Sequence, residues 1–336
     1  MTLFLILTLS LLVLWWIAWS IDERNVWSVG VYWSEQGDPE RLEPHPRARQ
    51  PVLSAADVTD VDAAAVADPF VVRDGERCYL FVEVVERATR RGAIGLARSG
   101  DGIAWRYERI VLREPFHLSY PYVFSYRGEH YMIPESRRAN AVRLYRAEAF
   151  PNGWRFEREL MQGDYHDPSI VRRDGRWWLF ALRGRRELTL HGAERLEGPW
   201  IEHPASPLAV DEPRLTRSGG RITMVGDRLL RFAQDDEGHY GRAVRAFEIV
   251  ALDASRYEER ELPGSPILAA SGSGWNADGM HHADLHDAGD GRLLAYVDGK
   301  RIVRCFRARK GARRVAAAIT APFRCASRKV ALRALR

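Results

Sequence analysis

HDPSIVRRDGRWWLFAL, residues 166–182, is the stretch of sequence that decides the fold. It starts with a short β-branched run, turns at Asp174-Gly175 and returns through an aromatic and aliphatic segment, which is the pattern of a β-hairpin. The same pattern occurs earlier as ADPFVVRDGERCYLFVE, residues 67–83, with Asp68 in the place of Asp167. A hairpin unit that recurs along a chain indicates a β-propeller or a solenoid.

Three weaker copies of this hairpin, at residues 119–136, 217–234 and 281–299, bring the number of units to five. The steps between the unit openings are 52, 47, 50 and 65 residues, which leaves room for three or four short strands in each unit. No apolar helical period stands out between residues 50 and 300, which disfavours α/β folds. The sequence therefore predicts an all-β fold, a five-bladed β-propeller. Its blades open at Asp68, Tyr120, Asp167, Arg217 and His282.

The composition fits a single all-β domain. The 336 residues include 11 Trp, 12 Tyr and 12 Phe, which suits stacked sheets and sugar-binding surfaces. The three cysteines lack the spacing of a metal site, so we expect no metal and no cofactor. Cys78 lies within a strand pattern and is expected to be a small, buried apolar residue.

Charge is distributed unevenly along the chain. Residues 300–336 hold 13 Lys and Arg and no Asp or Glu, whereas residues 1–299 hold 37 basic and 45 acidic residues, a balance of −8. A nucleic-acid partner would need the basic charge on the folded domain, so no nucleic acid is expected. The basic tail, residues 300–336, is interpreted as a solvated extension, and contact with anionic lipid headgroups is the alternative.

Leu3–Ile21 is a nearly unbroken apolar run of 19 residues that contains Trp15, Trp16 and Trp19 towards its end. That length is about the 20 residues that a bilayer-spanning helix needs, and Trp is common at membrane interfaces. Only two residues precede the run and no Ala-x-Ala site follows it, so we favour an uncleaved transmembrane or signal-anchor helix over a cleaved signal peptide. The expected localisation is the membrane, through a single-pass anchor at residues 1–21. The sequence does not indicate on which side of the membrane the propeller lies.

The segment between the anchor and the first blade contains one clear strand pattern, WSVGVYW at Trp27–Trp33. Its position before the first unit suggests that it pairs with the last blade and closes the ring, which removes exposed sheet edges. The expected organisation is thus an anchor at 1–21, a closing strand and linker at 22–66, the propeller at 67–299 and the basic tail at 300–336.

The candidate site lies at one rim of the propeller. In a blade, the start of the first strand and the end of the second strand share a rim, so the five opening residues should surround one mouth of the central channel. The same rim receives Glu83, Glu135, Gln234 and Asp298. The Asp-Gly turns lie at the opposite face, where turn geometry accounts for them. The residue that opens each blade differs between blades, which favours a binding site built from different groups. The alternative is a structural role, because Asp before Pro also commonly starts a turn.

Several motifs resemble a known family when taken together. They are ADPF (67–70), HLSYPYVF (117–124), YMIPES (131–136), RLYRA (143–147), RWWLF (176–180), GPW (198–200), RFAQD (231–235) and VDG (297–299). A five-bladed propeller with blades opened by Asp-Pro resembles the arabinanase, levansucrase and invertase superfamily, which includes glycoside hydrolase family 43. More closely, residues 27–299 resemble the N-terminal domain of plant glucosamine inositolphosphorylceramide transferases and its bacterial relatives. In the plant proteins this domain precedes a glycosyltransferase domain, which implies a carbohydrate or glycolipid ligand and a glycosyltransferase partner.

The resemblance to family 43 also implies catalytic roles. Asp68 would be the general base and Asp167 the residue that raises the pKa of the acid and positions the sugar. A third carboxyl would donate the proton, with base and acid about 6.5–9.5 Å apart for inversion. In family 43 that acid opens the fourth blade, where this sequence has Arg217, so Glu135 and Glu212 are the remaining candidates. Arg217 would instead suit a phosphate or carboxylate on a substituted sugar.

Three functions remain open from the sequence: a carbohydrate- or glycolipid-handling propeller associated with glycosyl transfer at a membrane, an inverting glycoside hydrolase, and a non-catalytic scaffold. The candidate catalytic residues are Asp68, Asp167 and Glu135. The candidate substrate-binding residues are Glu83, His117, Tyr120, Arg217, Gln234, His281, His282 and Asp298. Because two carboxylates in one funnel repel each other, at least one of Asp68 and Asp167 should have a raised pKa, with Arg217 opposing that rise.

Overall fold

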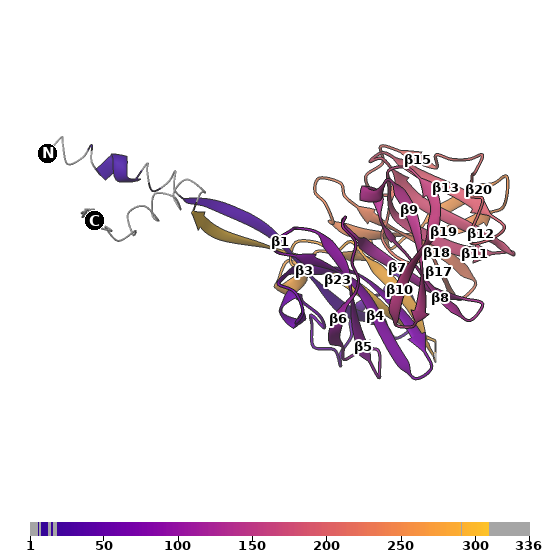
Figure 1. Cartoon of the computed structure of the whole chain (residues 1–336), viewed down its shortest axis with the longest axis horizontal. Helices are drawn as coiled ribbons and strands as arrows, with labels where there is room; N and C mark the ends of the chain where they lie inside the picture. The colour runs from indigo at the N-terminus through magenta and orange to yellow at the C-terminus, as the bar shows by residue number, and fades with distance from the viewer. Residues whose placement is uncertain (1–5, 7, 13–14, 16–18, 290, 309–336) are drawn as a thin grey trace, which may run out of the picture. The chain divides into compact units, whose positions relative to one another are not determined.

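A computed structural model describes residues 6, 8–12, 15, 19–289 and 291–308. Residues 25–302 form one compact unit, and residues 1–24 with 303–336 form a second. The larger unit consists of five sheets that follow one another along the chain (Figure 1). The first strands of successive sheets contact each other in a closed ring, from β3 through β7, β11, β16 or β17 and β22 back to β3. The predicted five-bladed propeller is confirmed.

In blades 1 to 3 the order of strands within each sheet follows the sequence. Blade 1 contains β3 (Ala63–Asp74), β4 (Arg77–Glu86), β5 (Gly92–Ser99) and β6 (Arg106–Leu112). Blade 2 contains β7 (Ser119–Tyr126), β8 (Glu129–Glu135), β9 (Ala141–Ala149) and β10 (Asn152–Gln162). Blade 3 contains β11 (Tyr165–Arg173), β12 (Arg176–Arg183), β13 (Glu187–Ala193), β14 (Ile201–Glu202) and β15 (Ala209–Val210), which also pairs with β13.

Blades 4 and 5 depart from this simple order. Blade 4 contains β16 (Arg217–Ser218), β17 (Thr223–Val225), β18 (Arg228–Asp235), β19 (Ala243–Leu252), β20 (Tyr257–Glu261) and β21 (Leu268–Ala269). Blade 5 contains β22 (Ala283–Gly289), β23 (Arg292–Ala308), β1 (Trp19–Ser34) and β2 (Glu43–Pro44). The remaining elements are single 3-10 turns, namely η1 (Ala55–Asp57), η2 (Arg137–Ala139) and η3 (Gly274–Asn276).

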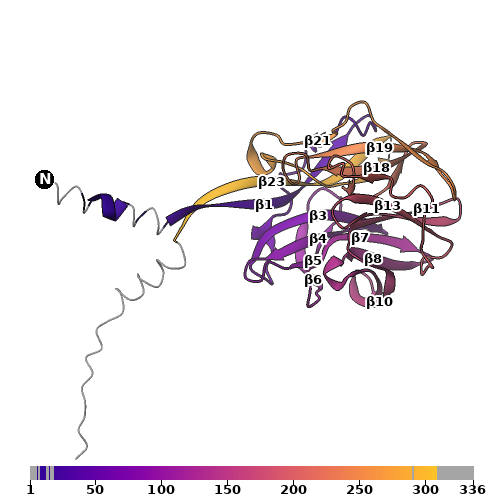
Figure 2. The same ribbon diagram turned by 90° about the horizontal axis from the view of Figure 1, so that it is seen from above.

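The N-terminal strand closes the ring as predicted. β1 lies between β23 and β2 in the sheet of the last blade, and the indigo and yellow strands run side by side in both views (Figures 1 and 2). The strand begins at Trp19, so the end of the predicted anchor, Trp19–Ile21, is extended rather than helical. Within the described part of the chain, no helix is long and apolar enough to cross a membrane. The anchor therefore stays a prediction, and the basic tail beyond Ala308 lies outside the described residues.

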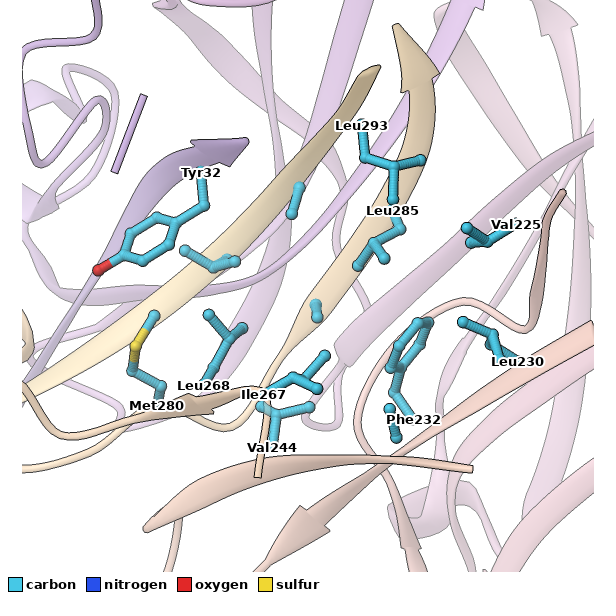
Figure 3. Packing of buried hydrophobic residues seen from close by; sticks show 14 of the residues in the cluster. Tyr32, Val225, Leu230, Phe232, Val244, Ile267, Leu268, Met280, Leu285 and Leu293 are labelled. Carbon is cyan, nitrogen blue, oxygen red and sulfur yellow. The ribbon is translucent and has the colours of Figure 1, made fainter. Parts of the chain in front are cut away.

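Five hydrophobic clusters hold neighbouring blades together. The cluster in Figure 3 joins blades 4 and 5, and it includes Phe232 and Val244 from blade 4 together with Met280 and Leu285. Tyr32 of the closing strand β1 belongs to the same cluster, so ring closure also buries apolar surface. The four other large clusters join blades 5 and 1, 1 and 2, 2 and 3, and 3 and 4. Cys78 is buried in the cluster between blades 5 and 1, as expected for a small apolar residue.

The first strands of blades 1, 2 and 3 contain the same β-bulge. Asp68-Pro69, Tyr120-Pro121 and Asp167-Pro168 each oppose a single residue of the second strand. Asp68, Tyr120 and Asp167 have φ values of 52°, 46° and 45°, a left-handed conformation that is unfavourable for a non-glycine residue, especially before proline. A bulge re-aims side chains, and here each opening side chain reaches the following blade. The Asp68 carboxylate accepts the Tyr120 N–H, Tyr120 contacts Ser169, and Asp167 accepts from Arg217.

Candidate functional site

A pocket of about 950 Å³ opens at the rim predicted from the sequence, and all five blades contribute residues to it. Its walls are formed around the ends of the second strands and the bulges of the first strands. In blades 1 and 2, the paired residues Ala67 and Glu83, and Ser119 and Glu135, line it in equivalent positions. Of the residues predicted from the sequence, six line the pocket. They are Asp68, Glu83, His117, Glu135, Arg217 and His281.

The other five predicted residues lie beneath the pocket, with almost no exposed surface. They are Tyr120, Asp167, Gln234, His282 and Asp298. The hydroxyl of Tyr120 donates to the Gly220 carbonyl at 2.9 Å and accepts the Gly220 N–H at 2.8 Å, so it links blades 2 and 4. The ring of His282 packs edge-on against Phe70 and Tyr120, and burial lowers its pKa to about 4. In this structure these side chains support the floor rather than face a ligand.

Glu212, the other candidate acid, is exposed in the loop before β16 and does not line the pocket. Blade 4 therefore presents Arg217, and no carboxyl, at its opening position. The loop at 236–241 of the same blade contributes Asp236 to the wall.

Asp68 occupies the centre of a buried charged group and is only 6% exposed. Its N–H donates to Asp298 at 3.1 Å, and the Asp298 carboxylate also binds Nδ1 of His281 at 2.7 Å. The Nε2 atom of His281 lies 3.9 Å from Asp68. Burial raises the pKa of Asp68 well above its usual value; His281 opposes this rise, and Glu83, Asp167 and Asp298 add to it. The expectation that one carboxyl has a raised pKa is met at Asp68.

Asp68, His281 and Asp298 are the one group of described residues whose spacing would suit a metal ion, with ligand atoms within 4.8 Å of one another. The hydrogen bonds and ion pairs among these three residues account for the short distances between them. Burial lowers the pKa of His281, but Asp298 outweighs burial and raises it to about 9. A protonated imidazole has no lone pair to offer a metal, so the group forms an ion pair as it stands.

The pKa of Asp167 is shifted in the opposite direction to that of Asp68. Burial alone would raise its pKa, but the Arg217 guanidinium, whose Nε donates to it at 2.6 Å, outweighs burial and lowers it. Gln234 donates to the same carboxylate oxygen at 2.8 Å. The sequence predicts that Arg217 opposes a rise in the pKa of a nearby aspartate, and in the structure that aspartate is Asp167. Arg217 is thus committed to a carboxylate, which weakens its expected role as the anion-binding residue.

Two glutamate–histidine pairs stand in the walls. Gly92 donates its N–H to Nδ1 of His117 at 2.8 Å, so Nε2 of that ring carries the proton towards Glu83, 3.2 Å away. A Cβ atom at Gly92 would lie 2.2 Å from the Leu118 carbonyl oxygen and 2.6 Å from the Glu83 carboxylate, and the backbone clash requires glycine there. His166 and Glu135 form the second pair at 3.5 Å, and burial raises the pKa of Glu135 despite His166. These groups offer donors and acceptors to the hydroxyls of a sugar.

An aromatic wall was not predicted from the sequence. Trp27 of β1 stacks on His281 with ring centroids 4.0 Å apart, and Tyr240 meets both rings edge-on. The Arg217 guanidinium lies 5.1 Å from the centre of the Tyr240 ring, and Tyr240 is 41% exposed in the pocket. Lys300 donates to the Tyr240 carbonyl and so helps to position its loop. The closing-strand pattern contains Trp27 and could have predicted its place, whereas no sequence pattern near Tyr240 indicates that it lines the pocket.

Below the floor, an ion pair between partly buried Arg221 and fully buried Asp284 occupies the centre of the ring. Arg221 donates to Asp284 at 2.7 Å, and to the carbonyls of Val71 and Val123 at 3.2 and 2.9 Å. It therefore joins blades 1, 2, 4 and 5. Burial would raise the pKa of Asp284, but Arg221 and His286 outweigh burial and hold it well below its usual range. The pocket is thus a blind funnel whose base is closed by charged and aromatic side chains.

The His281–Asp298 pair makes a testable contribution to stability. The folded-state pKa of His281, about 9, exceeds the ordinary 6.5, so this stabilisation is complete below pH 6.5 and is lost as the pH rises through 9. We expect the free energy of unfolding to fall by about 3 kcal/mol over that range in urea titrations. His281→Gln should flatten this profile. The matched control is His239→Gln, an exposed imidazole; identical profiles for both variants would contradict the assignment.

Comparisons with known proteins agree with this architecture. Residues 20–300 match the family described as glucosamine inositolphosphorylceramide transferase 1, N-terminal. A protein of that name from Oryza sativa subsp. japonica is 36% identical over 307 residues, which cover 84% of this chain and 41% of the relative. The Arabidopsis thaliana protein of that name is 32% identical over 305 residues, 84% of this chain and 40% of the relative. The chain thus spans about two fifths of the length of these relatives.

Solved structures show the same fold at low sequence identity. The catalytic domain of a GH62 α-L-arabinofuranosidase from Coprinopsis cinerea superposes with a TM-score of 0.55 at 13% identity, covering 70% of this chain and 91% of that one. An α-L-arabinofuranosidase from Podospora anserina, solved with cellotriose, gives a TM-score of 0.52 at 11% identity, with 71% and 91% covered. At these identities the likeness concerns the fold alone.

Proposed function

Because the chain belongs to the family of glucosamine inositolphosphorylceramide transferase 1 N-terminal domains, we propose that its propeller binds a saccharide, alone or as the headgroup of a glycolipid, in support of glycosyl transfer. The observation that carries this proposal is the blind pocket of about 950 Å³ to which all five blades contribute. Its volume is in the range of small-molecule sites, which are about 300–1,000 Å³. Its walls combine an aromatic surface with closely spaced carboxyl, imidazole and guanidinium groups.

The test is binding of the full-length chain, in detergent, to an array of neutral, phosphorylated and carboxylated glycans. We expect the wild type to bind a defined subset, and Tyr240→Ala to weaken that binding about 5-fold, since an aromatic contact is worth about 1 kcal/mol. Phe156→Ala is the matched control, because Phe156 is 49% exposed on blade 2 and does not line the pocket. A folded wild type that binds no glycan would favour the scaffold function instead.

Glycoside hydrolysis is the second candidate, favoured by the presence of both Asp68 and Glu135 in the pocket. A raised pKa suits Glu135 as a general acid, but the raised pKa of Asp68 opposes its use as a general base, which must be ionised. The proton donor would also come from blade 2, because blade 4 presents Arg217. We expect no release of reducing sugar from any glycan that the protein binds. If the wild type released reducing sugar and Glu135→Gln abolished that release, hydrolysis would be the function.

A further inference from the structure

Positive charge is concentrated at the pocket mouth. The lining residues include six arginines against four carboxylic acids, and two of those acids, Asp68 and Glu135, have raised pKa values. Residues 1–299 as a whole carry a balance of −8. The pocket therefore has the opposite sign to the domain that contains it, and a charged cleft attracts ligands of the other sign.

Five of these six arginines belong to three Arg-Arg pairs, one in each of the first three blades, and the sixth is Arg217. The pairs are 90–91, 137–138 and 185–186, and each follows the second strand of its blade at the pocket rim. One member of each pair binds within the protein. Arg91 donates to the Pro115 carbonyl at 2.6 Å, Arg137 to Asp164 at 2.9 Å and Arg186 to Asp211 at 2.7 Å.

The other member of each pair makes no such contact. Arg90, Arg138 and Arg185 are exposed, line the pocket, and have no hydrogen bond or ion pair from their side chains to any described residue. We call these three residues the arginine rim. Its three guanidinium groups come from the loops that follow the second strands of three separate blades. The pairing of one bound and one unbound arginine in each of these loops distinguishes this rim from scattered surface arginines.

We propose that the arginine rim binds a phosphate group carried by the saccharide that occupies the pocket. This inference rests on the proposed function and adds the charge class of the ligand. Guanidinium groups match phosphate oxygens in bidentate geometry. Arg217, deeper in the pocket, is already paired with Asp167, so the anion is held at the rim while the neutral part of the sugar reaches Tyr240 and Asp68.

The test compares two triple variants of the full-length chain in detergent. Arg90→Gln/Arg138→Gln/Arg185→Gln removes the rim. The matched control, Arg77→Gln/Arg109→Gln/Arg158→Gln, removes the same charge from exposed arginines outside the pocket. The probes are glucose 6-phosphate, glucose and inorganic phosphate in calorimetric titrations. Flotation with phosphatidylinositol or phosphatidylcholine vesicles distinguishes a lipid headgroup from a soluble sugar phosphate.

We expect the wild type to prefer glucose 6-phosphate over glucose, and the rim variant to bind the phosphorylated sugar about 10- to 100-fold more weakly. The control should bind as the wild type does, and added salt should weaken the wild type more than the rim variant. Both triples should keep the wild-type melting temperature. Equal binding of glucose 6-phosphate by the two triple variants would overturn the proposal that the arginine rim binds phosphate. Retained glycan binding would leave the proposed function intact. A wild type that binds phosphate but no saccharide would instead contradict the proposed function.

Discussion

Asp284→Ala is expected to lower the free energy of unfolding by about 3–5 kcal/mol, because it leaves the buried Arg221 guanidinium without its counter-charge. The variant also removes the acceptor of the Val71 N–H and of His286. Arg221 contacts four blades, so the loss acts on the ring as a whole. Urea unfolding followed by tryptophan fluorescence measures the change directly.

The matched control for this variant is Asp287→Ala, three positions further along the same strand. Asp287 is exposed and accepts a single local N–H from Gly289, so its loss should cost under about 1 kcal/mol. The double variant Arg221→Met/Asp284→Leu should recover much of the stability, since apolar replacement of a buried ion pair is often neutral. Equal costs for Asp284→Ala and Asp287→Ala would contradict the role of the pair.

Asp68→Asn and Asp167→Asn are expected to have different effects on stability. Asp167 is ionised and paired, so its replacement leaves Arg217 without a counter-charge and should cost about 3 kcal/mol. Asp68 has a raised pKa, and an asparagine amide can still accept the Tyr120 N–H. Its replacement should leave stability unchanged or raise it by about 1 kcal/mol at neutral pH, as expected for a destabilised functional carboxyl.

The pH dependence separates the two aspartates further. The folded-state pKa of Asp68 lies above the ordinary 3.8, so its ionisation makes stability fall as the pH rises above 3.8, and Asp68→Asn should remove that fall. The folded-state pKa of Asp167 lies below 3.8, so its contribution is present above 3.8 and is lost as the pH falls through the lower value. Denaturant titrations from pH 3 to 8 test both signs; parallel profiles for the two variants would refute this assignment.

The sequence by itself determined the fold. The hairpins, their turns and the closing strand around Trp27–Trp33 depend on residues close together in the chain, and the hairpin pattern repeats visibly. The equivalence of Asp68 and Asp167 follows from the same local pattern, as does the rim that they share.

Only the tertiary structure decided what each equivalent residue does. Asp68 meets His281 and Asp298, more than 200 positions away, whereas Asp167 meets Arg217, 50 positions away. These partners come from other blades, so ring closure gives one carboxyl a raised pKa and the other a lowered one. Likewise, Tyr120 and His282 open blades but lie beneath the floor, while Tyr240 and the arginine rim reach the pocket from loops without a strand pattern. Burial and charge pairing depend on contacts between distant segments, and a local pattern carries no information about them.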